Sequence, residues 1–134
     1  MDKVMKLLKA NTSMALATSC NDKPRSSIME YVMVGDNMIC STDPNSIKGK
    51  NLAKNPNVSL TVGSMPTYMA IDGKIAEPTR KEIEEYNKVL IARYPHFKEI
   101  MAAHPEAFKH FRVVFETAYY TACPEETETI KMGK

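Results

Sequence analysis

The alternation of apolar runs with turn-forming clusters predicts a structure built mainly from β-strands. Runs rich in apolar and β-branched residues are separated by polar clusters, among them Asn21-Asp22-Lys23-Pro24 and Gly35-Asp36-Asn37. Asp72-Gly73, inside one of the runs, is a candidate β-bulge. The strands predicted from this pattern span residues 14–18, 25–34, 38–41, 58–62, 68–76 and 112–121.

A second periodicity, with apolar residues three or four positions apart, predicts the helices. Thr79 and Glu82 form a capping-box pattern at the start of one of them. Another can begin at Asp43-Pro44 or at Ser46, and Asn55-Pro56 ends it. The expected helices are an N-terminal one capped by Asp2, this short one ending at Lys54, one over residues 80–93, and a piece over residues 97–110 interrupted near Pro105.

Length and composition limit the class of protein. The 134 residues predict a single domain over 1–134, in which the polar residues 124–134 form a mobile tail. Hydrophobic residues make up 43% and charged residues 25%, which is typical of a soluble globular protein. A net charge of +2 argues against a nucleic-acid partner, and no apolar run is long enough to span a bilayer. Three cysteines without CxxC spacing favour reduced thiols and a cytoplasmic location.

The short basic segment between the third and fourth predicted strands has the chemistry of a phosphate site. Ser41, Thr42 and Ser46 offer hydroxyl groups, Lys48 offers a positive charge, and a helix start offers free backbone N–H groups. The same residues can also form an ordinary helix cap beside a solvated lysine, and their types alone leave both interpretations open.

The order of elements and three sequence phrases resemble a known family. The phrases are ATS…DKPRSS, STDPNSIKGKNLAKNPNVSL and IDGKIAE; the second contains the pattern T-x-x-x-S-x-K-x-x-N-L followed by N-P-x-V. Over roughly residues 4–122 the chain resembles the FMN-binding split-barrel family related to pyridoxamine 5′-phosphate oxidase. The resemblance implies a mainly β (α+β) fold, a split antiparallel β-barrel with flanking helices. It also implies a homodimer that binds FMN in a cleft at the subunit interface.

The resemblance also implies which residues contact the cofactor. Residues matching Thr42 and Lys48 typically bind the phosphate in this family, and the second strand lines the ribityl chain and the flavin ring. Tyr68 falls where the family often has a polar residue near the flavin. The full set of cofactor-binding residues implied in this way is Ser26, Ser27, Ile28, Met29, Ser41, Thr42, Ser46, Lys48, Asn51 and Tyr68.

The chain departs from the true oxidases at several positions. They have an arginine where this chain has Ser27 and a second basic residue where it has Ile47. Arg25 and Lys50 are candidate substitutes, and Arg25 shares a strand face with Ser27 only if the strand is regular. The chain also lacks tryptophan, and its tail lacks the arginines that engage the vitamin in the oxidases. We therefore expect a relative of the oxidase and not the oxidase itself.

These observations predict a flavoprotein that acts as an oxidoreductase on an unidentified small molecule. A non-catalytic carrier of FMN or heme is the alternative, because no acid–base pair is recognisable and no catalytic residue can be named. A small nucleic-acid-binding barrel is disfavoured by the near-neutral charge. No metal site is expected, because His96, His104 and His110 lack ligand spacing.

Overall fold

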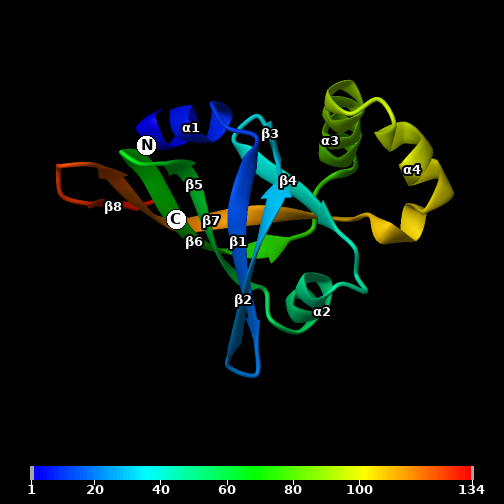
Figure 1. Cartoon of the computed structure of the whole chain (residues 1–134), viewed down its shortest axis with the longest axis horizontal. Coiled ribbons are helices and arrows are strands. Elements are labelled where there is room, and N and C mark those ends of the chain that lie inside the picture. Colours follow the sequence, from blue (N-terminus) through cyan, green and yellow to red (C-terminus); the bar gives the residue numbers. More distant parts are fainter. Residues whose placement is uncertain (1, 134) are drawn as a thin grey trace.

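An antiparallel sheet of eight strands curls into an open barrel in the computed structural model, which describes residues 2–133 (Figure 1). Its strand order is β2-β1-β5-β6-β7-β4-β3, and β8 pairs with β7. The strands are β1 (Ser13–Cys20), β2 (Lys23–Glu30), β3 (Val32–Val34), β4 (Asn37–Thr42), β5 (Asn57–Ser64), β6 (Thr67–Ala76), β7 (Lys109–Ala122) and β8 (Glu128–Lys131). The helices are α1 (Asp2–Lys9), α2 (Ile47–Lys54), α3 (Arg80–Arg93) and α4 (Phe97–Ala103), with a single 3-10 turn at Pro105–Ala107. The expected mainly β split barrel with flanking helices is confirmed.

The barrel is split where one predicted strand divides into two. Residues 25–34 were expected as one strand, but Tyr31 separates β2 from β3, and these two strands lie at opposite ends of the sheet order. The backbone N–H of Tyr31 donates to the Thr12 carbonyl at 3.0 Å, and its hydroxyl donates to the Leu8 carbonyl at 2.6 Å. Burial of this side chain against α1 therefore turns the chain from one sheet edge to the other.

The first hairpin is tighter than the sequence suggested. Only Asn21 and Asp22 form the turn, with φ of 53° and 61°, values that suit a two-residue hairpin of type I′. Lys23 and Pro24 already belong to β2, where an edge strand tolerates proline. The predicted irregularity at Asp72-Gly73 is present, but the extra residue lies on the facing strand: Asp72 pairs with Thr117 and Gly73 with Phe115, which leaves Glu116 of β7 without a partner in β6.

The core fills the inside of the curled sheet. Val4 and Leu8 of α1 are fully buried and close one end of the barrel, as their helical spacing predicted. The fully buried strand residues include Leu16, Met38, Leu60, Met69 and Ile71. Each such side chain contributes about 1.5–3 kcal/mol by leaving water, so the barrel interior accounts for much of the stability.

Helix α3 covers the outside of the sheet through a second, smaller apolar cluster. Tyr86 and Leu90 pack there against Val32 and Ile39. The predicted capping box is confirmed: the Glu82 N–H donates to the Thr79 hydroxyl at 3.1 Å, and the Thr79 N–H donates to the Glu82 carboxylate at 2.8 Å. This capping box satisfies free backbone N–H groups at the helix start and fixes the residue at which α3 begins.

Two expectations for the C-terminal third need correction. The helical piece expected over residues 97–110 ends earlier, because Lys109 and His110 pair with β4 and begin β7. The tail expected to be mobile contains β8, which pairs with residues 117–120 of β7. β7 is 14 residues long, and β4 pairs with only part of one of its edges. The rest of that edge has backbone N–H and C=O groups with which the polar tail pairs.

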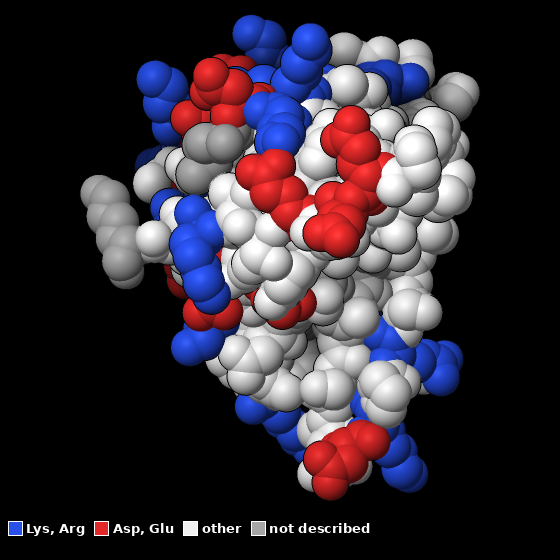
Figure 2. Space-filling view, turned by 90° about the vertical axis from the view of Figure 1, so that its left-hand side faces the viewer, with Lys and Arg blue, Asp and Glu red and all other residues white. Residues whose placement is uncertain are grey.

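Charges are spread over the surface near β8. Figure 2 shows acidic and basic side chains interspersed on this side of the molecule around a largely uncharged centre. Exposed ion pairs such as Lys3 with Glu128 and Lys74 with Glu116 link neighbouring elements, but each contributes little to stability in water. Among the helices of residues 2–133, none is long and apolar enough to cross a membrane.

Candidate functional site

Helix α2 begins at a turn that its own residues organise. Ser46 is the N-cap, which confirms one of the two predicted starts: its Oγ accepts from the Gly49 N–H at 3.0 Å and donates to the Asp43 carbonyl at 2.7 Å. The Asn45 N–H donates to a carboxylate oxygen of Asp43 at 2.8 Å. The N–H groups of Ile47 and Lys48, in the first turn, have no partner within the helix.

Gly49 lets α2 lie against this turn. A Cβ added there would stand 2.2 Å from the Asp43 carbonyl oxygen and 2.8 Å from Pro44 Cα, both of them backbone atoms. Neither atom can move without displacing the turn, so a larger residue would push the helix start away from the residues around it.

Lys48 is half-buried beside the barrel wall and forms no ion pair among residues 2–133. Its Nζ donates to Ser27 Oγ of β2 at 3.2 Å. Burial lowers the pKa of the amine, and the nearby Cys40 thiol acts weakly in the opposite direction. A partly desolvated ammonium group without a carboxylate partner is a place where an anion binds favourably.

A pocket of about 310 Å³ opens in front of Lys48. Thr42 Oγ1 and Ser46 Oγ, 3.4 Å apart, face the same space as the lysine. Phe108, which follows the 3-10 turn, supplies an aromatic wall. The residues that line the pocket are Ser41, Thr42, Asp43, Ser46, Lys48, Ala107 and Phe108. Asp43 adds a negative charge at the rim, and one of its oxygens is held by the Asn45 N–H.

Behind Ser41 lies a buried polar group that the sequence did not reveal. The hydroxyls of Ser41 and Tyr86 are 2.9 Å apart, and burial raises the pKa of Tyr86 to about 12, so its hydroxyl keeps its proton. The His110 ring contacts the Tyr86 ring edge-on at 5.2 Å, and its Nε2 is 2.9 Å from Asn87 Oδ1. Burial lowers the pKa of His110. Tyr86 lies on the buried face of α3, and the packing of α3 against β4 brings it to Ser41.

Strand β2 presents its predicted site residues on two faces. Ser27 and Met29 share one face; Ser27 meets Lys48, and Met29 is buried in the core. Ser26 and Ile28 lie on the other face, and Ile28 is 75% exposed. Ser27 thus contacts Lys48 without lining its pocket, whereas Ile28 extends into solvent.

The register of β2 with β1 is regular, so Arg25 shares the face of Ser27. Arg25 lines a second pocket of about 300 Å³ together with Ile47 and Asn51 on the other side of α2. Asn51 Nδ2 donates to Thr18 Oγ1 at 3.1 Å, so this predicted cofactor residue ties α2 to β1. Arg25, named above as a candidate substitute for the arginine of the oxidases, thus meets the condition of a regular strand, although it was not among the residues assigned to the site.

Tyr68 lies apart from the other predicted site residues. It pairs with Gly63 near the β5–β6 turn, whereas α2 leads through Pro56 to the opposite end of β6, where the Ile75 N–H donates to the Pro56 carbonyl at 2.9 Å. Within one chain, the structure therefore does not bring Tyr68 to the Lys48 pocket. Among residues 2–133, no cluster of three histidine, cysteine or acidic residues is arranged to hold a metal.

Comparisons with known proteins agree with this architecture. Residues 1–122 match the protein family described as Pyridoxamine 5′-phosphate oxidase, and no curated protein matches the chain. A NimC/NimA family protein from Clostridium acetobutylicum superposes with a TM-score of 0.75 at 18% identity, covering 98% of this chain and 92% of that one. An FAD-binding protein from Mesorhizobium loti gives 0.68 at 20% identity, covering 87% and 89%. A heme-binding protein from Mycobacterium smegmatis gives 0.73 at 16% identity, covering 96% of this chain and 56% of that one. At these identities the likeness to the three structures establishes the fold.

Proposed function

The chain belongs to the pyridoxamine 5′-phosphate oxidase family, and on that premise we propose that it is a flavoprotein that binds FMN without a covalent bond and acts as an oxidoreductase on a small molecule. The observation that carries the proposal is the half-buried Lys48, which lacks a carboxylate partner among the described residues and faces two hydroxyls at the start of α2. Kinship to a structure named as FAD-binding supports a flavin as the class of ligand.

The residues at this pocket fit a phosphomonoester. Such a phosphate carries a charge near −2 around neutral pH and accepts several hydrogen bonds. Lys48 supplies a charge-assisted donor, Thr42 supplies a hydroxyl, and the first turn of α2 supplies backbone N–H groups. Three kinds of donor outweigh the single carboxylate of Asp43, which is already engaged with the Asn45 N–H.

A second copy of the chain completes the proposed flavin site. Ser27, which is bonded to Lys48, and the exposed Ile28 next to it support a flavin ring that lies along the edge strand β2. Tyr68 can reach a flavin held there only from another copy, because it lies at the far end of β6 within its own chain. We therefore include a homodimer, with one FMN at each of two shared sites, in the proposal.

FMN, when bound, supplies the electron transfer through its isoalloxazine ring, and the protein positions it and tunes its surroundings. Ser41 and Tyr86 form a hydroxyl pair at the pocket wall. Tyr86 is protonated at neutral pH, as any tyrosine of ordinary pKa is, and burial raises its pKa further, to about 12; the pair can therefore donate a hydrogen bond to a ligand oxygen. Phe108 and Ala107 line the same pocket and add an apolar surface.

The alternative is a carrier that holds FMN or heme without turnover. Around the pocket, the described titratable groups include no carboxylate–histidine pair, because His110 bonds to Asn87 and Asp43 to Asn45. The fold is also shared with a structure named as heme-binding.

Anaerobic reduction separates the two candidates. We expect NADH or NADPH to bleach the absorbance of the bound flavin at least several times faster than that of free FMN, because the protein holds the ring in a fixed position. Dithionite serves as the control that the flavin is reducible. If dithionite bleaches the flavin and neither nicotinamide does, the result contradicts a nicotinamide-dependent reductase and favours the carrier. A heme-type absorption band in the purified protein would identify heme, and not FMN, as the ligand.

A further inference from the structure

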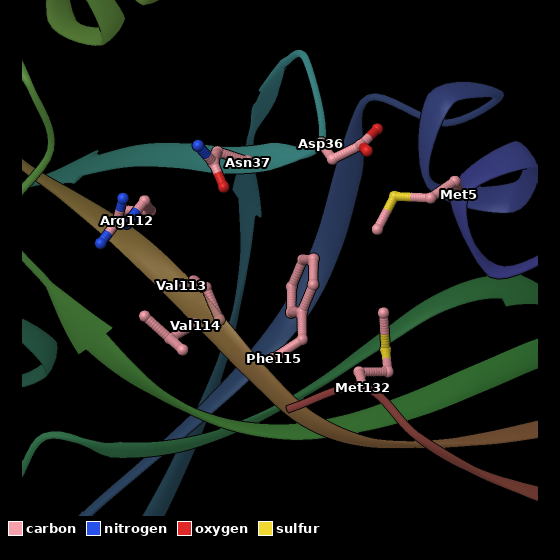
Figure 3. A pocket seen from close by; sticks show the side chains of 8 residues that line it. All are labelled: Met5, Asp36, Asn37, Arg112, Val113, Val114, Phe115 and Met132. Carbon is pink, nitrogen blue, oxygen red and sulfur yellow. The ribbon is translucent and has the colours of Figure 1, made fainter. Parts of the chain in front are cut away.

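A gap in the sheet forms a pocket at the opposite end of β4 from Thr42. On the same edge of β7, β4 pairs with residues 109–113 and β8 pairs with residues 117–120. Between these two strands a pocket of about 530 Å³ opens, and α1 forms part of its wall (Figure 3). It is lined by Met5, Asp36, Asn37, Arg112, Val113, Val114, Phe115 and Met132. None of these residues belongs to the proposed flavin site.

Arg112 lies in the wall of this pocket without a bonded partner. Its Nε is buried and has no hydrogen-bond acceptor among residues 2–133, and its guanidinium forms no ion pair there. Glu82 interacts with Arg112 electrostatically but is not bonded to it. The Glu82 carboxylate instead accepts hydrogen bonds from the Asn37 side chain at 2.7 Å and from the Thr79 N–H at 2.8 Å. The Thr79 bond is the main reason that the pKa of Glu82 is lowered, and Arg112 contributes from a distance. The Nε itself is closed to the pocket, but Arg112 lines the pocket and its guanidinium has no ion pair among residues 2–133, so an anion that enters can accept hydrogen bonds from the terminal N–H groups.

The rest of the lining is suited to an apolar body of limited size. Figure 3 shows the Phe115 ring at the centre, with Met5 and Met132 on one side and Arg112 and Asn37 on the other. Methionine side chains adapt to the shape of what they contact. The volume lies within the range of small-molecule pockets, roughly 300–1,000 Å³.

We propose that this pocket binds a small amphipathic monocarboxylate, with its carboxylate on Arg112 and its apolar body against Phe115, Met5 and Met132. The planar guanidinium matches a carboxylate, which accepts two parallel hydrogen bonds. A single negative charge on the ligand matches the single positive charge of the Arg112 guanidinium, and the Glu82 carboxylate near Arg112 makes a second one still less favourable. Asp36 is itself paired with Lys9 at 3.2 Å, which leaves Arg112 as the anion-binding group of the pocket.

Phenylacetate and its neutral counterpart phenylacetamide form a matched pair of probes. In methyl NMR of the methionines, phenylacetate should shift Met5 and Met132 saturably and leave the exposed Met65 of the β5–β6 turn in place. Phenylacetamide has nearly the same shape but lacks the charge that strengthens the bond to Arg112, so its affinity should be lower by roughly tenfold or more. Equal affinity for the two probes, or shifts at Met65 as large as those at Met132, would overturn the proposal.

Arg112→Gln should remove the preference for phenylacetate and leave phenylacetamide binding as it is. Lys109→Gln is the control, because Lys109 is an exposed basic residue on the same strand, pairs with Glu77 at 3.6 Å and lies outside this pocket. Lys48→Ala should bind phenylacetate like the wild type, so failure of the flavin proposal leaves this result unaffected. If Arg112→Gln does not fold, the comparison of the two probes on the wild type decides. Weaker self-association of Arg112→Gln, together with no phenylacetate binding to the wild type, would assign Arg112 to a carboxylate of a second copy and refute the ligand site.

Discussion

Lys48→Ala is expected to lower the affinity for FMN by roughly 10- to 150-fold, the equivalent of one lost charged hydrogen bond of about 1.5–3 kcal/mol. The fold should survive, because among residues 2–133 the lysine amine bonds only to Ser27, and the helix is capped by Ser46. Riboflavin has the same ring and ribityl chain without the phosphate, so its affinity should hardly change. Fluorescence titrations of both ligands against both proteins give the comparison.

Lys50→Ala is the matched control for this experiment. Lys50 is an exposed lysine two positions along the same helix and does not line the pocket of Lys48. We expect it to bind FMN almost as the wild type does, since exposed charges are screened. Equal losses of FMN and riboflavin affinity in Lys48→Ala would show that Lys48 does not bind the phosphate.

Ile28→Asp is expected to convert a dimer into a monomer and to weaken FMN binding with it. Ile28 is 75% exposed on β2, which is an edge strand of the sheet. A large apolar side chain beside unpaired strand backbone is a natural contact for a second copy, and a charge buried there is strongly unfavourable. Sedimentation at low micromolar protein, with and without FMN, measures the change; FMN should favour the dimer in the wild type, because it binds the shared site.

Ile100→Asp is the matched control, because it places the same charge on an exposed isoleucine outside the proposed dimer interface. Ile100 is 48% exposed on α4 and lies away from β2 in sequence and in the fold (Figure 1). The Ile100→Asp protein should remain a dimer. A wild-type monomer that still binds FMN tightly would refute the shared site while leaving the flavin itself in place.

Local sequence signals predicted the parts of the fold whose causes are local. The Thr79–Glu82 box and the Ser46 cap depend on residues within one turn of helix, and both appear as expected. The division of residues 25–34 at Tyr31 depends instead on a contact with α1. Strand β8 likewise depends on a free edge of β7, which no pattern within the tail itself could indicate.

The site shows the same division between local and long-range causes. Thr42, Ser46 and Lys48 lie on one short segment, so the sequence pattern could place them together. Their meeting with Ser27 followed only from the family resemblance, since 21 positions separate it from Lys48. Phe108 lines the pocket because it immediately precedes β7, which pairs with β4, and Tyr86 reaches Ser41 through the packing of α3. Spacing along the chain reveals neither contact.

An equilibrium titration of the apoprotein with FMN tests the central claim most directly. Flavin fluorescence should change saturably and reach its end point near one equivalent of FMN per chain, because each chain contributes one Lys48 pocket. The same titration should leave the methionine signals of the Arg112 pocket unchanged. No saturable change up to high micromolar FMN would contradict the assignment of this protein as an FMN-binding flavoprotein.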